Sequence, residues 1–241
     1  MARTVLFSNP EIATYINENF EPTWQSVREV PTITIDFGSG KSVKRTLNGN
    51  IASYVCTSNG KILDVLPGLY EARSYKDRLQ QLKMLHSYIA TLDGVKSDDA
   101  LFAYHKIQLQ RLERGQMPMR FAKTKENGIE AIKLSAKAKD PDRNWTVPID
   151  EETMHRVIPP PKNDIASWEK LSDDVRYNET SMRKQIHAHL LNEMTTHKAA
   201  AITSFSKWLY REVLHVDLDD PYLGLKPVLS DNYPFERSMK N

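Results

Sequence analysis

The chain has 241 residues, enough for one large domain or two small ones with a buried core, and its 40% hydrophobic content excludes a wholly disordered protein. Its 33 basic and 31 acidic residues nearly cancel, to a net charge of +2, and they are interleaved along the sequence. Proteins that bind nucleic acid usually concentrate their basic residues, so we expect no nucleic-acid partner. The densest lysine tract, residues 123–139, has no aromatic residue that could stack on a base.

No stretch approaches the ~18 consecutive apolar residues that a membrane-spanning helix needs, so we expect no membrane partner. The apolar run within Met1–Phe7 is too short for a signal peptide. The single cysteine, Cys56, permits no intramolecular disulfide, which is typical of a reducing compartment. If the chain is complete at Met1, these features predict a cytoplasmic protein.

Residues 1–92 alternate between helical and strand patterns. Asn9, Pro10 and Glu11 predict the start of a helix, because Asn9 can cap it and a proline suits its first turn. Alternating polar and apolar residues then predict strands. The expected elements after the first helix are a strand at Trp24–Val27, a hairpin over 32–47, strands at 51–57 and 61–66, and a helix from Glu71 to about residue 92.

From residue 95 the sequence has mainly helical periodicity. We expect helices over 98–115 and 129–139 with a loop at 117–127 between them. A proline-containing linker follows at 148–161, and two further helices are expected over 180–197 and 199–215. The predicted domains are therefore 1–94, a helical connection at 95–147, and a helical C-terminal domain at 148–241 that ends in an apolar tail.

The first of these regions contains a recognisable pattern of three segments: Phe7–Ala13, Tyr54–Leu63, and Pro67-Gly68-Leu69-Tyr70 followed by an amphipathic helix. This pattern resembles the thioredoxin-like fold family. It covers somewhat over a third of the chain. It implies an α+β or α/β fold, with a thioredoxin-like mixed sheet flanked by helices and a mainly helical domain after it.

The sequence departs from that family at both of its catalytic elements. The family's Cys-x-x-Cys dithiol belongs just before Phe7, where this chain has no cysteine. The family's cis-proline belongs near Ile51 or Ala52, where no proline stands. Disulfide exchange needs two neighbouring thiols, so we expect a redox-inactive version of the fold.

Cys56 is one candidate site, as a single-thiol redox sensor. A nearby cation would have to lower its pKa, but Tyr54, Val55 and Thr57 carry no charge. The alternative is that Cys56 acts as a small buried hydrophobic residue in a strand.

His189, Glu193 and His197 form a second candidate site. They are spaced four residues apart, so they project from successive turns of one helix. Two imidazoles and a carboxylate suit a divalent metal or acid–base work. Residues on one helix cannot easily surround an ion, and the alternative is a Glu–His hydrogen-bonded strip that faces another helix or solvent. No other cofactor is expected.

No complete catalytic set appears in the sequence, so we expect a non-enzymatic scaffold that binds a protein partner, a second copy of itself included. Aromatic residues could anchor such contacts, and the four tryptophans are Trp24, Trp145, Trp168 and Trp208. The alternative functions are a metal- or histidine-dependent activity at His189, Glu193 and His197, and the Cys56 sensor.

Overall fold

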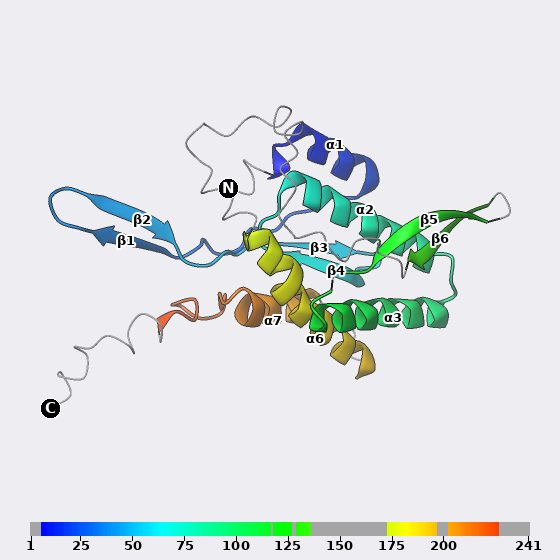
Figure 1. Cartoon of the computed structure of the whole chain (residues 1–241). Helices are drawn as coiled ribbons and strands as arrows, with labels where there is room; N and C mark the ends of the chain where they lie inside the picture. The colour runs from blue at the N-terminus through cyan, green and yellow to red at the C-terminus, as the bar shows by residue number, and fades with distance from the viewer. Residues whose placement is uncertain (1–5, 117, 127–128, 136–172, 197–201, 227–241) are drawn as a thin grey trace. The chain divides into compact units, whose positions relative to one another are not determined.

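The computed structural model describes residues 6–116, 118–126, 129–135, 173–196 and 202–226 (Figure 1). These residues form helices and three two-stranded antiparallel sheets, so the fold class is mixed α+β. The chain divides into two compact units, the first formed by residues 1–22 and 52–199 and the second by residues 23–51 and 200–241. The expected linker at 148–161 lies outside the described residues.

The first helix, α1 (Pro10–Asn19), begins where the sequence predicts. The Asn9 side chain accepts hydrogen bonds from the backbone N–H of Glu11 at 2.9 Å and of Ile12 at 3.3 Å. These bonds satisfy two amides that lack partners inside the helix. Ile12 is buried in the core of the first unit.

A hairpin and the helix after it form the centre of the first unit. Strands β3 (Ala52–Cys56) and β4 (Ile62–Pro67) pair antiparallel, and α2 (Ala72–Ile89) follows. Every residue of β4 is buried, as expected for a strand that is covered on both faces. The amphipathic helix expected from Glu71 is confirmed, because apolar residues at helical spacing form the buried face of α2: Tyr75, Leu79, Leu82, Leu85 and Ile89.

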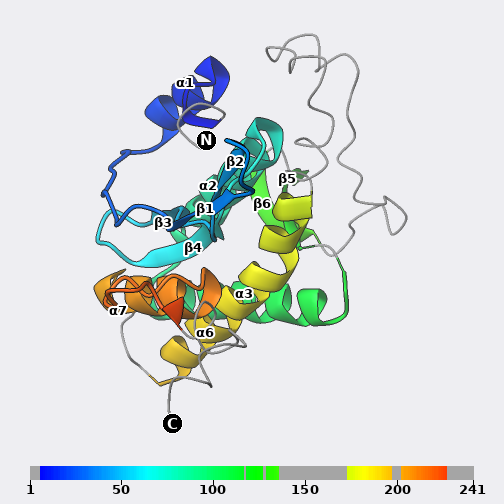
Figure 2. The same cartoon turned by 90° about the vertical axis from the view of Figure 1, so that its left-hand side faces the viewer.

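Further helices complete this unit. Helix α3 (Gly94–Glu113) begins earlier than expected because the Asp93 side chain caps it. A π-helical turn, η2 (Asn178–Met182), leads into α6 (Arg183–Thr195), which packs against α3. The hairpin β3–β4 lies between α2 on one side and α3 with α6 on the other (Figures 1 and 2).

The expected loop at 117–127 and helix at 129–139 are wrong. Residues 120–126 and 129–135 form a second antiparallel pair in this unit, β5 (Arg120–Glu126) with β6 (Ile129–Ser135). The tertiary structure selects this conformation, because side chains of neighbouring helices bind the backbone where β5 begins. Gln81 accepts from the N–H of Phe121 at 2.6 Å, and Gln108 binds both the N–H and the carbonyl of Met119.

The second unit contains the predicted hairpin over 32–47, formed by β1 (Thr32–Asp36) and β2 (Ser42–Thr46). It also contains α7 (Ile202–Trp208), which continues into the π-helical turn η3 (Leu209–Val213). The strand expected at Trp24–Val27 is wrong, because residues 21–31 adopt no regular secondary structure. None of the described helices has the length and apolar character needed to cross a membrane.

A close approach of backbone and side chain fixes the end of the central hairpin. Gly68 has a φ of +76°, and a Cβ at this position would lie 2.6 Å from Nδ2 of Asn178. That amide donates to the carbonyl of Leu69 at 2.9 Å, so it ties the hairpin to η2. Only a glycine permits both the backbone conformation and this contact.

We therefore expect Gly68→Ala to lower the free energy of unfolding more than Gly60→Ala does. Gly60 also has a positive φ, of +83°, but a Cβ there meets no described atom within 4 Å. Gly60→Ala, the control, should lower the free energy of unfolding only by the ~1–2 kcal/mol of left-handed backbone strain. Gly68→Ala should lower it by a further ~1–3 kcal/mol, because the new methyl group clashes with Asn178. Urea denaturation measures both, and equal losses would contradict the contact with Asn178.

Candidate functional site

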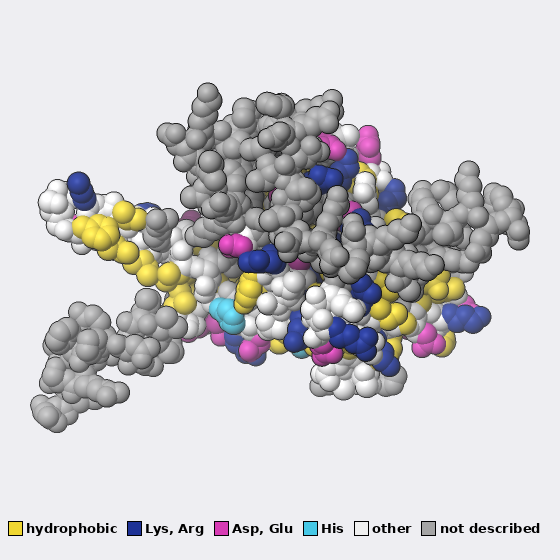
Figure 3. Space-filling view, in the orientation of Figure 1, with side chains coloured by type: hydrophobic (Ala, Val, Ile, Leu, Met, Phe, Trp, Pro, Cys, Tyr) yellow, Lys and Arg dark blue, Asp and Glu magenta, His cyan; other side chains and the backbone are white. Residues whose placement is uncertain are grey.

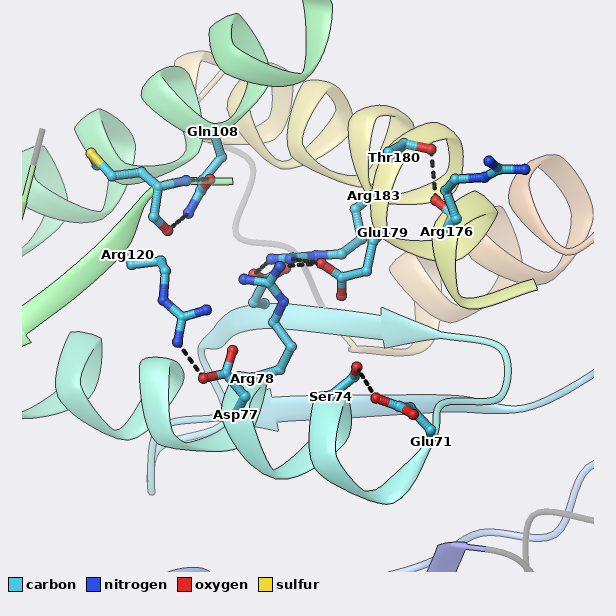
Figure 4. A network of polar contacts seen from close by, with 12 residues as sticks. Glu71, Ser74, Asp77, Arg78, Gln108, Arg120, Arg176, Glu179, Thr180 and Arg183 are labelled. Atoms are coloured by element: carbon cyan, nitrogen blue, oxygen red, sulfur yellow. Dashed lines mark hydrogen bonds and ion pairs between the residues drawn. The ribbon is translucent and has the colours of Figure 1, made fainter. Parts of the chain in front are cut away.

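Charged side chains from five elements meet in the interior of the first unit. Asp64 comes from β4, Arg78 from α2, Tyr104 from α3, Glu179 from η2 and Arg183 from α6. Figure 4 shows Arg78, Glu179 and Arg183 pointing toward one another between the helices and the hairpin. None of the five is more than 5% exposed. We call these five residues the buried ionic network.

Each carboxylate of the network is held by several donors. Tyr104 donates its hydroxyl to Oδ2 of Asp64 at 2.7 Å, and Arg183 forms an ion pair with the same oxygen. The other oxygen of Asp64 accepts from the N–H of Val65 at 2.8 Å. Arg183 also reaches Oε2 of Glu179, at 3.2 Å, which forms a second ion pair with Arg78. Two carboxylates and two guanidinium groups therefore neutralise one another.

The balance of burial and charge keeps both acids ionised. Burial alone would raise the pKa of Asp64, but the positive charge of Arg183 and the hydrogen bond from Tyr104 hold that pKa well below its usual range. Burial would also raise the pKa of Glu179, but the positive charges of Arg78 and Arg183 outweigh it and lower that pKa. Removing one arginine would leave a buried carboxylate without compensation.

Two buried histidines lie beside this network. Nδ1 of His105, on α3, is 3.0 Å from Nδ1 of His187, on α6. A hydrogen bond between two such nitrogens requires one to donate and the other to accept, so the two neutral rings hold different tautomers. Burial lowers the pKa of both rings, that of His105 to about 4, and both are therefore uncharged at neutral pH.

The chemistry of this cluster is structural. Its members are 0–5% exposed, both oxygens of Asp64 accept from donors, and Oε2 of Glu179 is paired with Arg78 and Arg183, whereas Oε1 of Glu179 is buried without a hydrogen-bond partner. No three ligating side chains of the described residues are grouped so that they could hold a metal ion. The network joins β4 to four helical elements and specifies how they pack.

The structure brings together two members of the predicted histidine site. Nε2 of His189 lies 3.4 Å from Oε1 of Glu193 on α6, and His197 lies outside the described residues. Burial lowers the pKa of His189 despite the opposing effect of Glu193. This pair matches the alternative of a Glu–His strip, and the metal site stays a prediction.

Neither buried histidine, His105 or His187, is among the site residues expected from the sequence. His187 lies on the face of α6 that enters the core, together with Arg183, Ile186 and Leu190. These four positions follow the i, i+3, i+4, i+7 spacing of a buried helical face. That spacing was available in the sequence, but Arg183 and His187 were not counted on the buried face because they are polar.

Cys56 ends strand β3 and is partly buried. Burial raises the pKa of its thiol, which disfavours the reactive thiolate. The environment therefore resembles that of a structural cysteine more than that of a sensor.

The second unit presents a different kind of site, on the hairpin β1–β2. Strand residues alternate between two faces, and the face that holds the Ile33–Arg45 and Ile35–Val43 pairs carries one charged residue, Arg45. Its apolar members are Ile33, Ile35, Phe37, Val43 and Leu47. Ile35, Phe37 and Val43 are 44%, 65% and 38% exposed. We call these five residues the apolar hairpin face, and Figure 3 shows hydrophobic side chains along this hairpin.

A hollow of about 560 Å³ adjoins the base of this face. Ile33 and Leu47 belong both to the hollow and to the apolar hairpin face, and Leu225 adds a third apolar wall. Arg211 and Asp217 also line the hollow. The apolar surface therefore continues from the exposed strands into a recess that carries both charges.

The second unit holds the hairpin base in place with polar contacts. Arg28 donates to the carbonyl oxygens of Asp220 at 2.6 Å and of Pro221 at 3.0 Å. Asn48 donates to the carbonyl of His215 at 2.9 Å. These bonds fix both ends of the hairpin to the segment after η3, so the apolar face is presented on an anchored element.

Comparisons of the chain with protein-family models, with curated proteins and with solved structures find no significant match to any of them. The two sites above therefore have to be interpreted from their own geometry.

We expect Arg183→Met to destabilise the first unit strongly, because it leaves Asp64 and Glu179 buried without their shared partner. Breaking a buried ion pair in this way costs ~3–5 kcal/mol. The matched control is Arg176→Met, which removes the exposed ion pair to Asp173 and should change stability by less than ~1 kcal/mol. Chemical denaturation measures both, and similar losses in the two variants would show that the network does not hold the fold.

The buried histidines predict how stability depends on pH. The unfolded chain protonates His105 near its ordinary pKa of 6.5, whereas the folded chain does so only at about 4. Between these values the unfolded state binds more protons, so the stability present above pH 6.5 is lost as the pH falls toward 4, by up to ~1.4 kcal/mol per pH unit for each histidine. A double variant, His105→Gln with His187→Gln, should lose less stability than the native chain between pH 7 and about 5. The exposed His86→Gln should behave like the native chain, and an unchanged slope in the double variant would contradict the assignment.

Proposed function

We propose that the chain is a non-enzymatic protein-binding or assembly module, in which the first unit is a rigid scaffold and the hairpin β1–β2 contacts the partner. The observation that carries this proposal is the exposed apolar hairpin face, with Phe37 65% exposed. A two-stranded hairpin is only marginally stable by itself, and it gains stability when its apolar face packs against something. Exposed contiguous apolar surface on an anchored element is typical of protein–protein contacts.

The chemistry of the first unit supports a scaffold role. Its buried ionic network is at most 5% exposed and its four charged members pair with one another, and burial disfavours the thiolate of Cys56. We propose that this unit is a redox-inactive relative of the thioredoxin-like fold. The order α1, hairpin β3–β4 and then α2 supports this interpretation, because it is the order expected from the resemblance in residues 7–70.

A photo-crosslinker in place of Phe37 tests this proposal. We expect benzoylphenylalanine at position 37 to give a discrete adduct in cell extract, because the side chain at this position is mostly exposed on the apolar face. Excess purified chain should compete the adduct away, whereas the variant Ile35→Thr with Val43→Thr should not compete.

The control for this experiment is the same crosslinker in place of Val95. Val95 lies on α3 of the first unit and is 75% exposed, but it belongs to no apolar sheet face. It should give no competed adduct. Identical adducts from both positions, or an adduct at position 37 that excess chain cannot compete, would contradict binding through the hairpin.

A further inference from the structure

Strand β1 has one edge that no described strand covers. The sheet of the second unit has only the order β1–β2 within the described residues, and Thr32, Thr34 and Asp36 are all exposed. The hydrogen bonds of this hairpin show which backbone groups point to that edge. Leu47 donates to the carbonyl of Pro31 at 2.8 Å, and Phe37 donates to that of Lys41 at 3.0 Å.

These two bonds set the alternation along β1. In an antiparallel pair, every second residue directs both its N–H and its C=O to the partner strand, and the residues between direct theirs outward. Since positions 31 and 37 face β2, Ile33 and Ile35 also face it. The outward groups therefore belong to the even residues Thr32, Thr34 and Asp36.

The outward groups of β1 are complementary to those of a second β1. An antiparallel pairing centred on Thr34 places Thr34 opposite Thr34 of the second copy, and Thr32 opposite Asp36 of the second copy. All three outward residues then find outward partners, which gives six backbone hydrogen bonds around a two-fold axis. No like charges face each other in this register.

The same register brings apolar side chains together. Between the hydrogen-bonded pairs, Ile33 lies opposite Ile35 of the second copy, in the closer type of cross-strand pair. The two apolar hairpin faces then join on one side of a four-stranded sheet. Three or more strands with a hydrophobic face are far more stable than an isolated hairpin.

The outer edge of β2, by contrast, disfavours pairing with a second copy of itself. Its outward groups belong to Ser42, Lys44 and Thr46, so the equivalent symmetric pairing would place Lys44 opposite Lys44 of the second copy. Like charges directly opposite each other are destabilising, and lysine on an edge strand commonly prevents pairing with another chain.

We propose that β1 pairs with β1 of a second copy of this chain, antiparallel about a two-fold axis at Thr34, to form the sheet β2–β1–β1–β2. This inference rests on the proposed function and names the partner at the β1 edge. Because a two-fold pairing is closed, it gives a dimer and no larger assembly. Pairing of β1 with β2 of another copy would instead grow without limit.

Sedimentation of the full chain over a wide concentration range tests the pairing. The native chain should shift from monomer to dimer and stop there. Thr34→Pro removes the outward N–H at the axis without touching a bond inside the hairpin, and it should weaken the dimer more than ~10-fold, the equivalent of ~1.4 kcal/mol. The matched control Thr46→Pro removes an outward N–H from β2 and should leave the dimer within ~2-fold of the native constant, since that edge is unused.

Two lysine variants test the register with a single chemical change. Thr32→Lys places an ammonium opposite Asp36 of the second copy, and over the two symmetric pairs it should tighten the dimer ~2- to 30-fold. Thr34→Lys places two ammonium groups opposite each other and should weaken it ~2- to 5-fold. Thr46→Lys controls for the added charge and should change the constant less than either.

A native chain that stays monomeric, or that grows beyond a dimer, would overturn this inference. So would a result in which Thr32→Lys and Thr34→Lys change the dimer dissociation constant in the same direction. The crosslinking at position 37 distinguishes this failure from that of the proposed function. If the purified chain is monomeric but position 37 still crosslinks to another protein in extract, the proposed protein-binding role stands and the pairing of two copies is wrong.

Discussion

The ion pair between Asp64 and Arg183 is the contact on which the first unit depends. It joins the fully buried strand β4 to helix α6 across more than a hundred residues of sequence, and neither side chain is more than 1% exposed. Glu179 and Arg78 extend the pair to η2 and α2. A buried charge cluster adds little net stability over an apolar core, but breaking one of its ion pairs leaves an uncompensated buried charge. The ion pairs therefore favour the observed packing of the hairpin and its helices over arrangements that separate the charges.

The two units use charge and apolar surface in opposite ways. In the first unit, the charged groups of the buried ionic network are enclosed and strand β4 is buried along its whole length. In the second unit, the hairpin β1–β2 exposes Ile35, Phe37 and Val43, and its two edges differ in charge. The proposed contact with another protein would account for both the exposure and the difference between the edges.

Local sequence signals predicted elements well where they did not depend on distant residues. The Asn9 cap, the alternation over 32–47 and the stripe of α2 each define their element within about 20 residues, and each is confirmed. The hairpin at 120–135 was missed because Gln81 and Gln108, from other helices, hold the start of β5. The buried ionic network was missed for a related reason. Charged residues such as Asp64, Glu179 and Arg183 are expected at the surface. Only their pairing with residues distant in the sequence offsets the free-energy cost of burying them.

The most direct test of the central claim, that β1 is a contact edge, is amide hydrogen exchange measured residue by residue at low and high protein concentration. The outward amide of Thr34 should exchange rapidly in dilute solution and become protected as concentration rises, because it then donates to a second copy. The outward amide of Lys44, on the other edge, should exchange rapidly at every concentration. Equal protection of the two amides, or no change for Thr34, would contradict the account.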